Sequence, residues 1–378
     1  MSMTPQYSHT TRLNDYIAFM LPWAHGHQLK GITDYVSAII EQQTGCQAQL
    51  ARYFDNQEAA VKRLSRLLHN ERLDPKVLAD AVLLQAIHQL PETGKIRLAI
   101  DWTIEDKQHL LVVSLIRGRR GVPIYWRAYD ASVLKGRMKR YETAVVRRAV
   151  TRVIQAVGKR RVIVTADRGF ADVALFTLLG KLGIRFIIRV KSGTHVQFQG
   201  HWCPLGQIKF RRNERHRSLG DLLYCKGCPQ RLWVSKSRAR DAKGNWGIWH
   251  LISNHPYNAK RASDEYGRRF GCEEGFRDAK WWLGFAKSRI GQIKAWSRMF
   301  ALFSIALLVM TTLGSELLLV QGRRAMDLLR RVASRRRGRC ELGLVSAVMH
   351  LLRRDKTLYE ALCPHAKLRL ESTLANVS

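Results

Sequence analysis

The sequence is 378 residues long and 46% of its residues are hydrophobic, which excludes an intrinsically disordered chain and allows two or three domains with buried cores. The charge is strongly unbalanced, because 64 Lys and Arg residues against 30 Asp and Glu residues give a formal net charge of +34. Such an excess repels itself inside a compact protein. We therefore expect a polyanionic partner, with nucleic acid favoured over an anionic membrane surface.

The sequence gives no sign of secretion or of a membrane span. Met1 to Asn14 is polar, and the longest apolar stretch, Met299 to Leu313, is shorter than the ~20 residues that a span requires. We predict a buried helix there. The seven cysteines stand at scattered spacings, which favours a reducing compartment over a disulfide framework. We expect a cytoplasmic, nucleoid-associated protein with no membrane partner.

Helical spacing of apolar residues dominates residues 1–90, which we interpret as an all-helical N-terminal domain that binds DNA. The periodicity predicts three helices, over Asp34–Gln43, Gln57–His69 and Lys76–Leu90. Residues 91–95 contain Pro and Gly and are interpreted as a linker.

The pattern then changes to alternating strands and helices, in the order βββαβαβ, which predicts a layered α/β domain over residues 91–290. The strands are expected over Ile96–Trp102, Leu110–Ile116, Val122–Tyr129, Arg161–Ala166 and Ile184–Val190, and the helices over Arg137–Val157 and Ala171–Leu182. The first three strands are expected to form an antiparallel meander.

Residues 191–256 interrupt this alternation and are interpreted as a β insertion, with strands near Arg231–Val234 and Trp246–Ser253. Helices resume at about Ala262. Residues 291–378 form a predicted helical C-terminal region with a basic tail. The basic block Ser334–Arg339 is either a solvated loop or a DNA contact.

Two aspartates stand at the ends of apolar strands. Asp101 ends the run Leu98–Trp102, and Asp167 follows the run Val162–Ala166. Either aspartate alone could be a helix cap or a turn residue. Two of them on neighbouring strands of one sheet could share a divalent metal ion.

A polar stripe follows on a predicted helix, formed by Tyr266, Arg269, Glu273 and Lys280. These positions fall within an arc of about 60° on one helix face. Large apolar residues flank the stripe on both sides: Phe270 and Trp281 on one, Phe276 and Leu283 on the other. This framing favours an active-site strip. A surface helix with an Arg269–Glu273 ion pair is the alternative interpretation.

The spacing of this stripe, Tyr-x2-Arg-x3-Glu-x6-Lys, resembles the Tyr-Arg-Glu-Lys signature of bacterial insertion-sequence DDE transposases. The sequences around Asp101 and Asp167 are similar to the two aspartate motifs of that family. The similarity covers about residues 96–315 and implies an RNase H-like fold of the retroviral-integrase superfamily, with the β insertion placed before Glu273.

The resemblance implies cleavage of double-stranded DNA at the element ends and joining of the freed 3′-OH ends to target DNA. Asp101, Asp167 and Glu273 would be catalytic and would hold two Mg²⁺ ions, with Mn²⁺ as a substitute. Arg269 and Lys280 would contact DNA phosphates and Tyr266 would position them. A homodimer on DNA is expected. If Arg269 and Lys280 prove dispensable for assembly on DNA, they are better explained as residues that orient Glu273.

Further observations leave alternatives open. Some members of the family hold a flipped base with an aromatic residue of the insertion, and Trp246 and Trp249 are the candidates for this role, although such residues also serve as packing. Cys225-x2-Cys228 has the spacing of half a zinc site, whereas His201-x-Cys203 is too tight for the other half, and small buried cysteines are the preferred interpretation.

Two other functional classes compete with a transposase. They are a transposase-derived DNA-binding protein without activity and an RNase H-like nuclease without strand transfer. The presence of all three carboxylates, together with Arg269 and Lys280, favours an enzyme.

Overall fold

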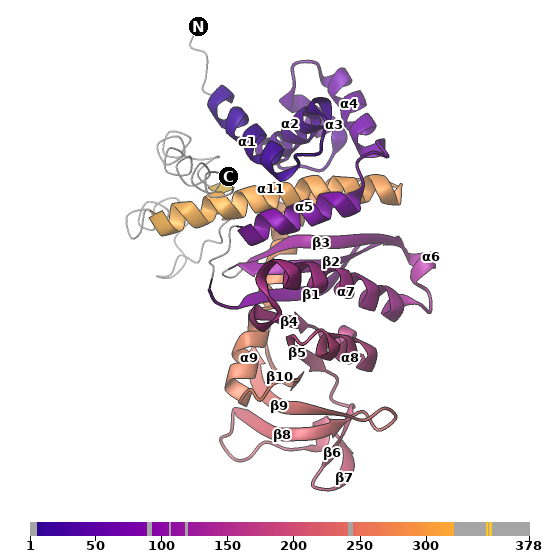
Figure 1. Ribbon diagram of the computed structural model, residues 1–378, viewed down its shortest axis with the longest axis vertical. Helices are drawn as coiled ribbons and strands as arrows, with labels where there is room; N and C mark the ends of the chain where they lie inside the picture. Colours follow the sequence, from indigo (N-terminus) through magenta and orange to yellow (C-terminus); the bar gives the residue numbers. More distant parts are fainter. Residues whose placement is uncertain are drawn as a thin grey trace. The chain divides into compact units, whose positions relative to one another are not determined.

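Figure 1 shows a computed structural model of the chain, which describes residues 6–88, 93–105, 107–117, 120–240, 245–320, 345, 346, 348 and 349. The chain forms two compact units. One comprises residues 1–90, 122–128 and 274–378, and the other comprises residues 91–121 and 129–273. The predicted basic block Ser334–Arg339 lies outside the described residues.

The first unit is built mainly from helices. They are α1 (Gln6–Met20), α2 (Gly26–Gln42), α3 (Gln47–Leu50), α4 (Gln57–His69), α5 (Pro75–His88) and α11 (Ile293–Val320). The predicted helices at α4 and α5 are confirmed, whereas α1 was not predicted. Helix α2 begins earlier than predicted, because its first turn is capped: the backbone N–H of His25 donates to the side chain of Gln28 (3.0 Å).

Helix α11 is long and apolar enough to cross a membrane, but its most apolar window is entirely buried within the protein. It packs against α2, α4 and α5. The buried Arg298 on α11 donates to the backbone carbonyls of Leu73 (2.7 Å) and Leu68 (2.9 Å), which satisfies its guanidinium. The predicted buried helix is therefore confirmed, and it forms the core of the first unit.

The strands form one mixed sheet, which in the described part of the chain has the order β3-β2-β1-β4-β5-β10-β9-β8-β6-β7. Strand β1 pairs antiparallel with β2 and parallel with β4, and β4 pairs parallel with β5. The bounds are β1 Ile96–Glu105, β2 Gln108–Arg117, β3 Arg120–Asp130, β4 Val162–Ala166, β5 Arg185–Val190, β6 His195–Phe198, β7 His201–Pro204, β8 His216–Tyr224, β9 Gln230–Arg240 and β10 Trp246–Ser253.

The predicted mixture of helices with a large sheet is confirmed, and the strands between residues 195 and 253 extend that same sheet. Helix α7 (Met138–Val157) packs against β2 and β4, whereas α8 (Val173–Lys181) packs against β5 (Figure 1). Because successive strand residues face opposite sides, Phe186 meets Phe176 of α8 while Ile187 joins the core under α9 (Ala259–Gly267). Helices therefore cover both sides of the sheet at β5.

The prediction that a single helix carries the polar stripe is wrong. The chain forms α9, then a tight turn, then α10 (Phe270–Arg277) and a π-helical turn over Asp278–Trp282. In the turn, the N–H of Arg269 bonds to the carbonyl of Tyr266 (2.9 Å), a three-residue spacing that tightens the backbone. Gly267 and Gly271 flank this turn, and glycine has a low helix propensity, which allows the helix to break here. The wider π turn shifts the phase again before Lys280.

Candidate functional site

Strand register places Asp101 beside Asp167. Ile100 on β1 pairs with Ala166 on β4, so the aspartate that follows each of them lies one position further along adjacent parallel strands, which are about 4.8 Å apart. Ala166 in turn pairs with Ile188 on β5, which makes Arg189 the next member of the row. The Arg189 guanidinium lies 4.0 Å from Asp167 Oδ1. The predicted strand end at Asp101 is wrong, because β1 continues to Glu105. The register of adjacent parallel strands, with Asp167 directly after β4, thus brings two carboxylates and one cation to a single face.

The end of α9 and the segment after it add three more of the predicted residues to this face. The hydroxyl of Tyr266 donates to Asp167 Oδ1 (3.2 Å). The guanidinium of Arg269 donates to Asp101 Oδ2 (3.2 Å) and to Glu273 Oε1 (2.5 Å). Arg269 therefore links the carboxylates of Asp101 and Glu273, which are 168 and 4 residues away from it in the chain. Its own side chain is 5% exposed.

Burial and mutual repulsion set the charges at this site. Burial raises the pKa of the Asp101 carboxyl, which Arg269 opposes and Glu273 and Asp167 reinforce. For Arg269, burial alone would lower the pKa, but Tyr266 and the surrounding carboxylates raise it overall, so the guanidinium stays charged. Burial raises the pKa of Tyr266 to about 12, which keeps its hydroxyl protonated as a hydrogen-bond donor.

The three carboxylates supply the hard oxygen donors that divalent cations such as Mg²⁺ prefer. Asp167 Oδ2 and Glu273 Oε2 have no hydrogen-bond or ionic partner among the described residues, so each side chain keeps one oxygen open. Within the same residues, however, no three His, Cys, Asp or Glu side chains already form a metal-binding group. Arg269 lies between Asp101 and Glu273 instead. The donor set fits a divalent cation, provided that Arg269 yields part of its contacts.

Further polar contacts hold the residues that follow the two aspartates. Trp102, next to Asp101, donates its indole N–H to Glu142 on α7 (2.9 Å). Lys139 donates to the same carboxylate (2.8 Å) and also to the backbone carbonyl of Gly169, two residues after Asp167. Glu142 is 3% exposed. It was missed in the sequence, although a lone acidic residue in a basic helix is a usable signal.

Close backbone packing fixes the helix that carries Glu273. A Cβ atom on Gly121 would lie 2.8 Å from the Cα of Cys272 and 3.0 Å from the carbonyl oxygen of Gly271. Only glycine allows this approach, since real Cβ atoms essentially never come that near. The thiol of Cys272 also contacts the Ser114 hydroxyl on β2 (3.4 Å). The start of α10 is thereby held against the sheet.

The two candidate tryptophans of the insertion differ in environment. Trp249 is 5% exposed and packs edge-on against Tyr266 (5.1 Å between ring centroids) and beside Phe270 (5.6 Å), so it is a packing residue behind the site. Trp246 is 58% exposed and lies under the guanidinium groups of Arg215 (5.1 Å) and Arg240 (4.9 Å).

The cysteines of the insertion differ from the expected buried residues. Cys228 is exposed, and Cys203 and Cys225 are half-buried. They are free thiols, and with His201 they form no metal-binding group within the residues that the structure describes.

Lys280 lies in the π-helical turn and belongs to the first unit, whereas Asp101, Asp167, Tyr266, Arg269 and Glu273 all belong to the second.

A mixed α/β unit that brings carboxylates from adjacent parallel strands beside an acidic residue of a nearby helix offers oxygen donors for a divalent cation. Residues 132–308, somewhat less than half of the chain, match the family described as the transposase DDE domain. This span includes Asp167, Arg269 and Glu273 but begins after Asp101, which the strand register independently places beside Asp167. No curated protein matches the sequence significantly. The match supports a relationship of this chain to DDE transposases.

Proposed function

We propose that this chain is an RNase H-like DDE transposase that cuts DNA at the ends of an insertion sequence and joins the freed 3′-OH ends to target DNA. The observation that carries the proposal is the convergence of Asp101, Asp167 and Glu273 from separate elements onto one face. The family match over residues 132–308 and the net charge of +34 support it.

The residues of the site would have different roles in metal binding, positioning and DNA contact. Asp101, Asp167 and Glu273 would hold Mg²⁺, and such bound cations lower the pKa of an attacking water and stabilise the leaving oxygen. Tyr266 orients Asp167 through its hydroxyl. Arg269, with a side chain only 5% exposed, orients Asp101 and Glu273 and has little surface left for a phosphate. We therefore assign Arg269 a positioning role and keep phosphate contact for Lys280.

Transposition also requires two DNA ends to be processed together, so we propose that the protein acts as a homodimer on DNA. The substrates are the element ends and a target duplex. The Tyr-Arg-Glu-Lys signature that suggested this chemistry is retained in the sequence, although the helix that would carry it is broken after Gly267.

The test uses the full chain and a donor plasmid that carries its gene with the native flanking DNA. Nicked or linearised donor and donor joined to a second plasmid are measured with Mg²⁺, with Mn²⁺ and with EDTA. We expect metal-dependent cleavage and joining in the parent and neither in Asp101→Ala, Asp167→Ala or Glu273→Ala. Asp264→Ala is the matched control, because among the described residues this exposed carboxylate on α9 pairs only with Lys260 (2.7 Å).

The outcomes separate the alternatives. Cleavage without joined products would identify a nuclease without strand transfer. DNA binding without any cleavage would identify a non-catalytic DNA-binding protein. Substantial cleavage by any one of the three carboxylate variants would remove that residue from the site.

A further inference from the structure

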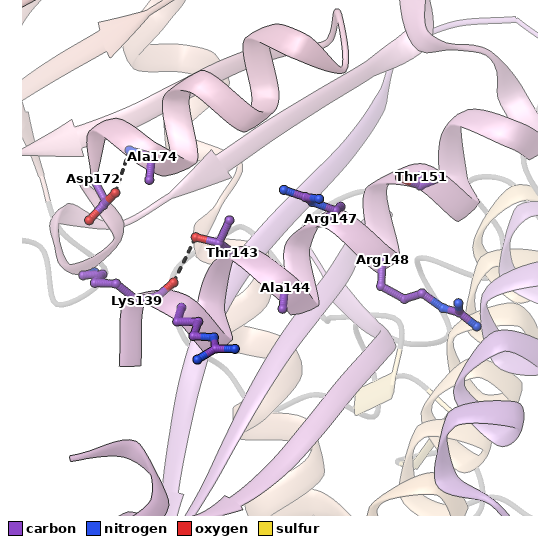
Figure 2. A pocket seen from close by; sticks show the side chains of 9 residues that line it. Lys139, Thr143, Ala144, Arg147, Arg148, Thr151, Asp172 and Ala174 are labelled. Carbon is purple, nitrogen blue, oxygen red and sulfur yellow. Dashed lines mark hydrogen bonds between the residues drawn. The ribbon is translucent and has the colours of Figure 1, made fainter. Parts of the chain in front are cut away.

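A groove of about 740 Å³ runs along the outer face of α7 in the second unit. Figure 2 shows the helix with its arginine and small side chains along this groove and α8 beside it. Lys139 lies at one end of the groove, and the rest of its helix side consists of Arg140, Thr143, Ala144, Arg147, Arg148 and Thr151.

The helical phase explains why the groove is both basic and open. At about 100° per residue, these six positions fall within an arc of about 140° on α7. The buried residues of α7, such as Val146, Ala149 and Val153, occupy the opposite face and pack on the sheet. Alanine and threonine line the middle of the groove, so a backbone can approach the helix closely between flanking guanidinium groups.

The charge along this helix is one-sided. Residues 135–161 contain ten Lys and Arg residues and a single acidic residue, Glu142, which is buried and already bonded to Lys139 and Trp102. The exposed side chains of Arg140 and Arg147 have no ionic or hydrogen-bonding partner within the described parts of the chain. These two cations are available to a ligand. Repulsion between like charges so close together costs free energy, which an anionic ligand would recover.

The opposite wall contains one carboxylate. Asp172 precedes α8, and its side chain accepts a hydrogen bond from the backbone N–H of Ala174 (2.7 Å), as Figure 2 shows. Asp172 is therefore committed to capping α8. It borders the groove on that side, so an anion would lie nearer to the arginines of α7 than to α8.

One end of the groove lies next to the loop that follows Asp167. Lys139 lines the groove and also bonds to the carbonyl of Gly169, in the loop that follows Asp167. The same lysine bonds to Glu142, which holds Trp102 beside Asp101. A chain of phosphates that lies along α7 would thus be directed toward the loop that follows Asp167 and the part of β1 that carries Asp101.

We propose that the groove of α7 binds the phosphodiester backbone of duplex DNA next to the candidate site. The distance from Lys139 to Thr151 along the helix is roughly 18 Å. This length corresponds to about five phosphates of one strand, which recur every ~3.4 Å along the axis of B-form DNA. The choice of DNA rather than another polyanion rests on the proposed function, whereas the position of the contact rests on the groove alone.

The test compares two double variants of the full chain by binding to a fluorescent 20-base-pair duplex over a range of salt concentrations. Arg140→Gln with Arg147→Gln removes two groove cations and keeps a side chain that favours helix. Lys181→Gln with Lys226→Gln removes the same charge from exposed positions outside the groove and is the matched control. The groove variant should lower the log–log salt slope by about 1.8, or 0.9 for each lost phosphate contact. If the affinities converge at 1 M salt, this corresponds to about 30-fold weaker binding at 0.15 M.

A second variant, Ala144→Glu, keeps every cation but places a negative charge on the exposed helix surface within the groove, and it should also weaken binding. An unchanged slope and affinity in the groove variants, or an equal loss in the control, would overturn the proposal. Loss of binding to anionic vesicles with duplex binding retained would also overturn it, in favour of a membrane surface. If the parent protein itself fails to bind duplex DNA, both the groove proposal and the proposed function are refuted. If the parent protein cleaves DNA and the groove variants bind duplex DNA as the parent does, only the groove proposal is refuted.

Discussion

Replacement of Arg269 by alanine tests whether its guanidinium supplies positive charge that a metal ion can replace. The variant leaves Asp101 and Glu273 without the cation that links them. Breaking a fully buried ion pair costs about 3–5 kcal/mol. The carboxylates here are 24% and 38% exposed, so water recovers part of that cost. The lost packing over the Tyr266 and Phe270 rings adds to it (5.7 and 5.5 Å). We expect a loss of about 2–3 kcal/mol in the free energy of unfolding without metal.

Divalent cations should restore part of this loss. In Arg269→Ala, Mg²⁺ meets two carboxylates whose charges are no longer offset, so it should bind more tightly than in the parent. A ligand at 100 times its dissociation constant stabilises the folded state by about 2.7 kcal/mol. Denaturant melts with EDTA and with Mg²⁺ measure the effect without reference to DNA cleavage. The gain in stability from Mg²⁺ should be larger in the variant than in the parent.

The matched control is Arg97→Ala, in the same unit. Arg97 forms a two-point ion pair with Glu265 on α9, at 2.7 and 2.8 Å, and their side chains are 23% and 15% exposed. Its removal should also destabilise the protein, but Mg²⁺ should not restore the loss. The reasoning is refuted if Arg269→Ala is as stable as the parent, or if Mg²⁺ rescues both variants equally.

Four further predictions address the site and its surroundings. Glu273→Gln should abolish cleavage and leave the affinity for duplex DNA unchanged, with both measured on one preparation. Lys280→Ala should weaken complexes with cleaved ends, and Lys280→Arg should restore part of the affinity in the same gel-shift assay. Burial lowers the pKa of His250 to about 4, so below pH 6.5 the unfolded chain takes up a proton more readily than the folded protein does. The free energy of unfolding should therefore fall by about 3 kcal/mol between pH 6.5 and 4, and His250→Gln should abolish this part of the pH dependence. Gly121→Ala should displace Cys272 and reduce both the melting temperature and the cleavage rate, whereas a parent-like rate would show that α10 tolerates the shift.

Strand patterns in the sequence predicted that Asp101 lies on one apolar strand and that Asp167 follows another, but not that β1 continues past Asp101 to Glu105. The register of β1 with β4 determines that the two aspartates are neighbours. Arg189 could not be found in this way, because its role depends on the pairing of β4 with β5. A sequence shows which residues favour a strand, but it does not show which strands are adjacent.

Helical periodicity predicted which residues of the stripe belong together, but not how they are arranged. A uniform helix would have placed Arg269 and Lys280 on one face. The glycines at 267 and 271 are each tolerated inside helices, so neither predicts a break on its own. The break coincides with the close approach of Gly121 to Cys272, a contact across about 150 residues that local propensity cannot reveal.

The inward position of Arg269 follows from this break in the helix. The free-energy cost of burying its guanidinium indicates that the residue serves the function of the site rather than the stability of the fold. On an uninterrupted surface helix, the Arg269–Glu273 pair would lie along the exposed side and contribute little. The tight turn instead places the guanidinium between Glu273 and Asp101, where its Nε is buried without a hydrogen-bond partner in the described structure. Burying a charge with one donor unsatisfied costs free energy, and apolar side chains in place of the whole ion-paired group would generally be at least as stable. A cation at this point therefore serves the three carboxylates: it offsets their repulsion in the absence of metal and leaves Asp167 Oδ2 and Glu273 Oε2 open for a metal ion to bind.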